Sequence, residues 1–151
     1  RMVIFASEDV GLADNRALEV AVAAAHALSF VGLPEATFAL THAALYLATA
    51  PKSNSVTTTM AAARRAVREG PTPAVPLHLR DAHYSGAGEI GHGEGYLYPH
   101  DYPGHIVDQQ YWPDGQPPRT LYRPSKQGAE KARAEWFAEL EAMIGRKRNR
   151  E

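Results

Sequence analysis

The sequence contains no cysteine, and this absence removes several classes of site at once. Without thiols the chain cannot form disulfides, zinc–thiolate sites or a cysteine nucleophile. It also lacks an apolar run near the ~20 residues that cross a bilayer. The net charge of −1 gives no general attraction to nucleic acid or to an anionic membrane. With 151 residues, 44% of them hydrophobic, the chain is predicted to form a globular domain with its own core.

Catalytic and nucleotide-binding motifs are missing as well. Seven histidines invite a metal site, but no pair has the helical i, i+4 spacing of H-E-x-x-H. No G-x-S-x-G elbow accompanies the serines. The glycine-rich stretch GAGEIGHGEG, residues 86–95, lacks the G-K-[ST] of a phosphate-binding loop and favours a turn region. We therefore expect no catalytic residue, metal or cofactor in this chain, with a small histidine-based metallohydrolase as the enzymatic alternative.

The first 70 residues are predicted to form helices. After Asp14, a good N-cap, residues 15–32 show the apolar period of a helix and end at a glycine. A second helix is expected between Pro34 and Pro51. A third is expected over residues 53–70, beginning at a serine or asparagine and ending at a glycine.

The first two of these helices are apolar nearly all round, whereas a surface helix keeps a polar face. Such alanine-rich helices lie in the centre of a bundle or against another subunit, and their small side chains let backbones approach closely. We expect the helices from about Asp14 to Glu69 to form most of the subunit core and of its interface with other copies. The candidate interface residues are Leu18, Val22, Phe38, Leu45 and Leu47.

The composition changes over residues 71–124, which hold most of the prolines and glycines and every tyrosine except Tyr46. Disordered segments are depleted in aromatics, so we expect an ordered wrap, packed by its aromatics onto the helices. Short 3₁₀ or strand pieces are expected within it, including one helical turn at residues 77–82. We refer to residues 71–124 as the wrap.

The last segment returns to a helical period. Residues 125–146 are expected to form a helix that Ser125 caps, with one apolar stripe. Its basic end is a candidate for phosphate contact, although cations there also complement the helix dipole. These basic residues are Arg146, Lys147, Arg148 and Arg150. The sequence thus predicts an all-α, bundle-like oligomerisation domain over residues 1–151: a helical core to residue 70, an ordered wrap and a C-terminal helix.

The stretch GHGEGYLYPHDYPGHIVDQQYWPDG, residues 91–115, is the most distinctive in the chain. Its tyrosines could stack on bases, but it contains no lysine or arginine to bind phosphates. A packing role is favoured, in which its polar groups satisfy otherwise stranded backbone groups. The alternative is a docking module for DNA or protein that uses the wrap or the basic tail. The candidate residues are Tyr96, Tyr98, His100, Asp101, Tyr102, Asp108, Gln109, Gln110 and Tyr111.

Four collinear stretches resemble the C-terminal domain of the RarA/MgsA family, which are replication-associated recombination ATPases of the AAA+ clamp-loader clade. The stretches are ASEDVGLADNRAL, YLATAPKSNSV, VPLHLRDAHY and GEGYLYPHDYPGHIVDQQYWPD, and the resemblance covers residues 1 to about 130. It implies a helical domain that assembles its parent protein into a homotetramer. It also implies that ATP and Mg²⁺ bind an N-terminal ATPase module outside this chain, so that the fragment itself is not an enzyme.

The resemblance also implies a cellular process, partners and a location for the parent protein. The parent protein would be a DNA-stimulated ATPase that acts at stalled or gapped replication forks, in replication, recombination and repair. Its partners would be further copies of itself, DNA forks and single-stranded DNA-binding protein, and no membrane. It would be associated with the nucleoid in the bacterial cytoplasm. We therefore expect a non-catalytic oligomerisation and scaffold domain, in which Tyr98→Ala or Asp101→Ala weakens stability or assembly.

Overall fold

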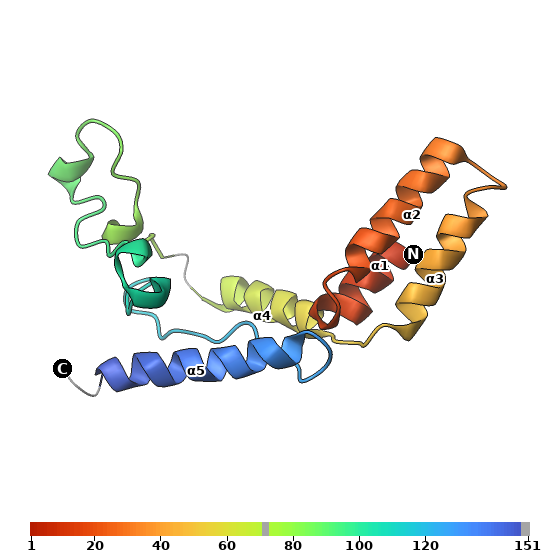
Figure 1. Cartoon of the computed structure of the whole chain (residues 1–151). Coiled ribbons are helices and arrows are strands. Elements are labelled where there is room, and N and C mark those ends of the chain that lie inside the picture. The colour runs from red at the N-terminus through yellow and green to blue at the C-terminus, as the bar shows by residue number, and fades with distance from the viewer. Residues whose placement is uncertain (71–72, 149–151) are drawn as a thin grey trace. The chain divides into compact units, whose positions relative to one another are not determined.

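A computed structural model describes residues 1–70 and 73–148, which form two compact units. The first unit comprises Arg1–Ala66 and Thr120–Glu139, and the second comprises the described residues of Val67–Arg119 and Leu140–Glu151. Helices, turns and extended linkers account for the described residues, with no strand among them (Figure 1). The predicted all-α class is confirmed.

Two helices of the first unit, α2 (Ala17–Val31) and α3 (Thr37–Thr49), lie side by side as a hairpin (Figure 1). Alanines make up much of both sequences, and small side chains allow the close approach of two helices. The chain leaves α2 at Gly32, whose φ of 79° is in the region that favours glycine. The predicted end of this helix is therefore confirmed.

The residues before the hairpin complete the core of the first unit. Helix α1 (Met2–Phe5) continues into a π-helical turn (Ala6–Val10) and a 3₁₀ turn (Gly11–Ala13). The core combines these turns with α2 and α3, and it consists of Ala6, Val10, Ala17, Ala21 and Leu47. Alanine thus dominates the buried apolar residues that the structure describes, and few large side chains are buried with them.

Two predicted helix caps are wrong. The Asp14 carboxylate accepts hydrogen bonds from the backbone N–H of Arg16 at 2.9 Å and from the Tyr46 hydroxyl at 2.8 Å, and α2 begins later without a side-chain cap. The last helix, α5 (Glu130–Arg148), begins after the predicted cap Ser125. In both cases the helix begins further along the chain, and the side-chain oxygen accepts instead from the backbone N–H two residues later, that of Arg16 or Gln127, ahead of the first turn of the helix.

The remaining elements follow the predicted order. Helix α4 (Ser55–Glu69) is the third predicted helix. In the second unit, the described part of the wrap contains the predicted helical turn as a 3₁₀ turn. The 3₁₀ turns of this unit are Leu77–Leu79, Ala87–Ile90, Pro99–Asp101 and Pro103–His105. Across residues 1–70 and 73–148, no helix is both long and apolar enough to cross a membrane.

Candidate interaction surfaces

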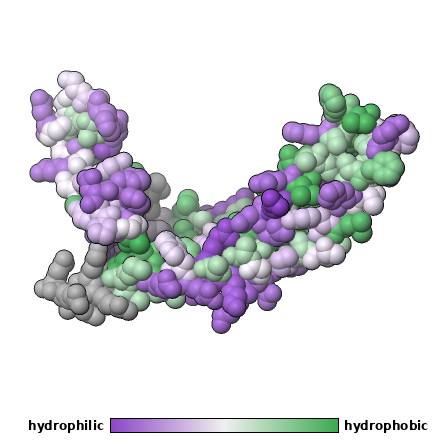
Figure 2. All heavy atoms as spheres, in the orientation of Figure 1, coloured by the Kyte–Doolittle hydropathy of each residue, from purple (hydrophilic) through white to green (hydrophobic). Residues whose placement is uncertain are grey.

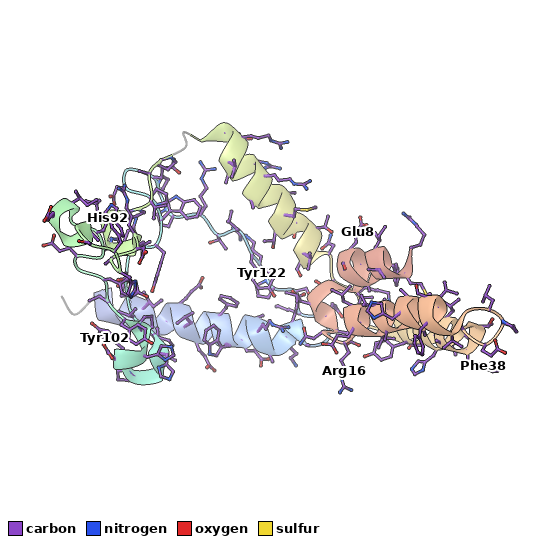
Figure 3. All side chains as sticks on the ribbon, turned by 90° about the horizontal axis from the view of Figure 1, so that it is seen from above. Glu8, Arg16, Phe38, His92, Tyr102 and Tyr122 are labelled. Carbon is purple, nitrogen blue, oxygen red and sulfur yellow. The ribbon has the colours of Figure 1, made fainter. Side chains whose placement is uncertain are left out.

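The outer surface of the α2–α3 hairpin is rich in exposed apolar side chains (Figure 2). Four predicted interface residues lie on it, with exposed fractions of 44% for Leu18, 36% for Val22, 83% for Phe38 and 64% for Leu45. Figure 3 shows Phe38 near the end of the hairpin where α2 and α3 are connected. The fifth predicted residue, Leu47, is only 2% exposed and packs in the core. Leu47 is therefore a core residue rather than part of an exposed surface.

The last turn of α2 and the connection to α3 add further large apolar side chains to this surface. Phe30 is 92% exposed and Leu33 is 68% exposed. Large apolar side chains exposed together on one pair of helices are typical of an interaction site in soluble proteins. We call this surface the hairpin face and define it by Leu18, Val22, Phe30, Leu33, Phe38 and Leu45.

A groove of about 960 Å³ lies along α3 within the hairpin face. Phe38, Leu45 and the ring of Tyr46 supply much of its apolar lining, together with Pro34 and three threonines. His42 also lines it, but no carboxylate, lysine or arginine does. The groove can therefore accept an apolar side chain or helix without leaving a charge unpaired.

A buried carboxylate connects distant segments of the first unit. Glu130, the first residue of α5, has no exposed surface. Its carboxylate accepts hydrogen bonds from the hydroxyls of Ser53, Ser55 at 2.5 Å, Tyr122 at 2.7 Å and Ser125 at 2.6 Å. The backbone N–H of Ser125 donates a further bond at 3.2 Å. Neutral donors, rather than a cation, therefore stabilise the buried charge. We call these five residues the Glu130 hub.

The hydrogen bonds of the hub determine its ionisation. Burial by itself raises the pKa of Glu130, but the hydrogen bonds from Ser125, Ser53, Ser55 and Tyr122 lower this pKa to about 2. Burial likewise raises the pKa of Tyr122, and the neighbouring Glu130 carboxylate raises it further, to about 12. At neutral pH the carboxylate is therefore ionised and the phenol neutral, which is the pairing that their hydrogen bond requires.

The predicted residues of the wrap make local contacts within the second unit. The Gln109 side-chain oxygen accepts from the backbone N–H of Leu97 at 2.6 Å. The Gln110 amide donates to the backbone oxygen of Trp112 at 2.7 Å. The backbone oxygen of Gln110 also lies 2.6 Å from Nε2 of His78. These contacts join parts of the wrap that are separated along the chain.

The aromatic residues of the wrap remain largely accessible. The rings of Tyr98, His100 and His105 follow one another, with centroids 5.1 Å and 4.6 Å apart. Tyr96, Tyr98 and Tyr111 retain 44%, 52% and 54% of their surface. Of the nine predicted residues, Tyr96, Tyr98, His100, Asp101, Gln110 and Tyr111 are exposed, and Tyr102, Asp108 and Gln109 are half-buried. Burial of these exposed tyrosines against the helices is therefore not confirmed.

Other candidate chemistry finds little support in the described residues. The basic tail, Arg146, Lys147, Arg148 and Arg150, has its side chains outside the described residues, so phosphate contact there stays a prediction. Between residues 1 and 148, apart from 71–72, no three His, Asp or Glu side chains form a group that could hold a metal ion. The glycine-rich stretch at 86–95 consists of turns and does not lead from a strand into a helix, as a phosphate-binding loop does.

Comparison with known proteins gives the family. Residues 1–141 match the family model described as MgsA AAA+ ATPase C terminal. The chain belongs to the MgsA AAA+ ATPase C-terminal family. The resemblance found in the sequence is thus confirmed, and it extends beyond the residue, about 130, to which the four stretches carried it.

Several longer proteins are similar to this MgsA C-terminal domain. An uncharacterized AAA domain-containing protein of Mycobacterium tuberculosis is 49% identical over 148 residues, covering 98% of this chain and 33% of the relative. Replication-associated recombination protein A of Bacillus subtilis is 41% identical over 128 residues, covering 85% and 30%. The Escherichia coli protein of the same name is 40% identical over 154 residues, covering 99% and 34%. The chain therefore spans about a third of the length of these relatives.

The Glu130 hub of this MgsA domain is the feature that the sequence reasoning missed. A glutamate in the first turn of a helix ordinarily indicates a favourable interaction with the helix dipole, and it is usually exposed. Ser125 has the residue type and position of a helix cap, so its contact with Glu130 was not expected either. The sequence does place three serines and a tyrosine near the starts of two helices. Only the fold shows that their hydroxyls meet at the Glu130 carboxylate.

Proposed function

We propose that this chain is the self-association and scaffold domain of an AAA+ ATPase that acts in replication-associated recombination. The hairpin face is the observation that carries this proposal. Soluble domains of this length normally bury most of their large apolar side chains. Here Phe30, Leu33, Phe38 and Leu45 are each more than 60% exposed within the chain itself. Covering such a surface stabilises an assembly by roughly 25 cal/mol per Å² before the costs of association.

A second copy of the chain is the partner that suits this face. In a two-fold interface a surface patch meets itself, so a charge near the two-fold axis faces a like charge. The groove along α3 avoids that repulsion because no carboxylate, lysine or arginine lines it. The alanine-rich surfaces of α2 and α3 also permit close helix packing between subunits. A second pairing of this kind would give the homotetramer.

The proposal assigns catalysis to the rest of the parent protein. Two of the relatives carry the name replication-associated recombination protein A, and this chain covers about a third of each. ATP and Mg²⁺ would bind an ATPase module outside this chain, which itself would not be catalytic. DNA forks and single-stranded DNA-binding protein would be partners of the whole protein at the nucleoid, in the bacterial cytoplasm.

Light scattering of the chain at micromolar concentration tests the proposal. We expect the mass of a tetramer, and a lower mass for the double variant Phe38→Ser/Leu45→Ser. The stability of the individual variant subunit should change little, because both replaced side chains are exposed. The matched control is Val75→Ser/Ile90→Ser, which changes two residues of the second unit that are each 56% exposed and should keep the mass. A monomeric wild-type chain would contradict the proposal.

The exposed tyrosines favour a second candidate function, the docking of a protein partner on the wrap. Tyr96, Tyr98 and Tyr111 keep about half of their surface, and tyrosine is enriched in protein interfaces. Calorimetry with single-stranded DNA-binding protein would test this function. A Tyr98→Ala variant should bind single-stranded DNA-binding protein more weakly than the wild type does. The Phe38→Ser/Leu45→Ser variant should keep the wild-type affinity per subunit.

A further inference from the structure

Helix α4 carries a group of arginines that lie outside the hairpin face. Arg64, Arg65 and Arg68 are all exposed. At about 100° per residue, the three lie within an arc of roughly 100° on one side of the helix. Arg64 and Arg68 are one turn apart, about 6 Å along the axis. Figure 3 shows nitrogen-tipped side chains projecting from one side of α4.

These arginines have no partner among the residues that the structure describes. The ion pair found there joins His83 and Asp81, and none of the three guanidinium groups donates a hydrogen bond to a described residue. Other arginines are engaged: Arg80 donates to the backbone oxygen of Val75, and Arg133 to that of Leu12. The arginines of α4 therefore differ from those that stabilise the fold.

Interaction with the dipole of α4 explains the position of only one of these arginines. A cation in the last turn of a helix interacts favourably with its C-terminal end, and the effect falls off within that turn. Arg68 is the basic residue of the last turn. Arg64 and Arg65 precede it, where neighbouring positive charges repel one another at a cost to the isolated helix. Their grouping calls for a negatively charged partner.

We propose that Arg64, Arg65 and Arg68 bind the phosphate backbone of a single strand of nucleic acid. Guanidinium groups bind phosphates through paired hydrogen bonds, and here three of them gather on one side of a helix. A flexible strand can follow one helix face, because its backbone is not held in a duplex.

This surface is distinct from the tyrosine-rich stretch and the basic tail that the sequence singled out. The stretch at 91–115 contains no lysine or arginine, so it offers bases a stacking surface but offers phosphates no cation. The inference does not depend on the hairpin face, which involves α2 and α3.

Fluorescence anisotropy of the whole chain with a labelled single-stranded DNA of mixed sequence tests the inference. Three phosphate contacts predict that the logarithm of the binding constant falls with the logarithm of salt concentration with a slope of about −2. A tenfold rise in salt should thus weaken binding about 100-fold. The triple variant R64Q/R65Q/R68Q should bind at least tenfold more weakly at low salt and lose most of this slope. Glutamine is a good helix former, so α4 should persist.

The control variant R119Q/R123Q/K126Q removes the same charge from three exposed residues elsewhere. It should retain both the affinity and the slope. Equal weakening by both variants would show a general charge effect and overturn the inference, as would unchanged binding by the α4 variant. Displacement of the DNA by poly-glutamate at equal charge would assign α4 to an acidic protein instead. Light scattering of the α4 variant separates the two proposals, because a loss of mass would place these arginines in the subunit interface.

Discussion

The hydroxyl of Ser55, the first residue of α4, donates a 2.5 Å hydrogen bond to the carboxylate of Glu130, the first residue of α5. The two residues are 75 positions apart in the sequence. The starts of both helices therefore meet at one buried negative charge, which is the sign that a helix N-terminus favours. This contact explains how the segment after the wrap is fixed to the helices of the first unit.

Replacement of Glu130 by glutamine should destabilise the first unit by about 3 kcal/mol. The amide has one oxygen acceptor instead of two, and its NH₂ group would face hydroxyls that donate to the native carboxylate. Urea unfolding followed by circular dichroism measures the change. Glu135→Gln, at an exposed position of the same helix, should change the free energy of unfolding by less than about 0.5 kcal/mol. Equal effects of the two substitutions would contradict the role given to the hub.

The hub also predicts how stability depends on acid. The pKa of Glu130 in the folded chain is about 2, against an ordinary value of 4.5. A group whose pKa is lowered by folding stabilises the fold above its unfolded pKa, and this contribution is lost as the pH falls through the folded pKa. The wild-type chain should therefore lose stability between about pH 4.5 and pH 2. In thermal melts over this range, Glu130→Gln should show a shallower loss than the wild type.

The opposite sign applies to Tyr122 in alkali. Its pKa is raised to about 12 from an ordinary value of 10.0, so the contribution to stability is complete below pH 10 and is lost as the pH rises toward 12. An ultraviolet titration of the tyrosines should contain one late step near pH 12. Tyr122→Phe should remove that step, whereas Tyr98→Phe, at an exposed residue, should leave it in place.

Local patterns sufficed to predict the helices, because apolar period, glycine and proline act over a few neighbouring residues. The end of α2 at Gly32 and the turn at Leu77–Leu79 are examples. The hub could not be predicted this way, since Ser55 and Glu130 meet only after the chain has folded. For the same reason Leu47 was indistinguishable from Leu45: both are apolar residues of one alanine-rich helix, and only the packing of α2 decides which is buried.

Gly128 lies where a side chain has no room. Its φ is 50°, and a Cβ there would lie 2.1 Å from the backbone oxygen of Ala13 and 2.7 Å from Cγ of Pro51. Gly128→Ala should therefore cost about 3 kcal/mol, from the clash together with the left-handed backbone. Gly86→Ala is the control, because its φ is 86° but nothing lies within 4 Å of the added Cβ. It should cost only about 1 kcal/mol in chemical denaturation, and a similar cost at both sites would rule out the clash.

Leu45 and Leu47 separate the stability of the subunit from its association. Leu47 is 2% exposed and belongs to the core, so Leu47→Ala should lower the free energy of unfolding by about 3 kcal/mol through the lost contacts and the cavity left behind. Leu45 is 64% exposed on the hairpin face, so Leu45→Ala should change the stability of the isolated subunit by less than about 0.5 kcal/mol. If the hairpin face binds a second copy, the same substitution should shift the assembly toward smaller species in sedimentation at a fixed concentration. The two residues lie on one helix and undergo the same chemical change, so their difference isolates the direction in which each side chain points. A Leu45→Ala variant that keeps its full mass at every concentration, beside a destabilised Leu47→Ala variant, would show that this leucine makes no contact between subunits.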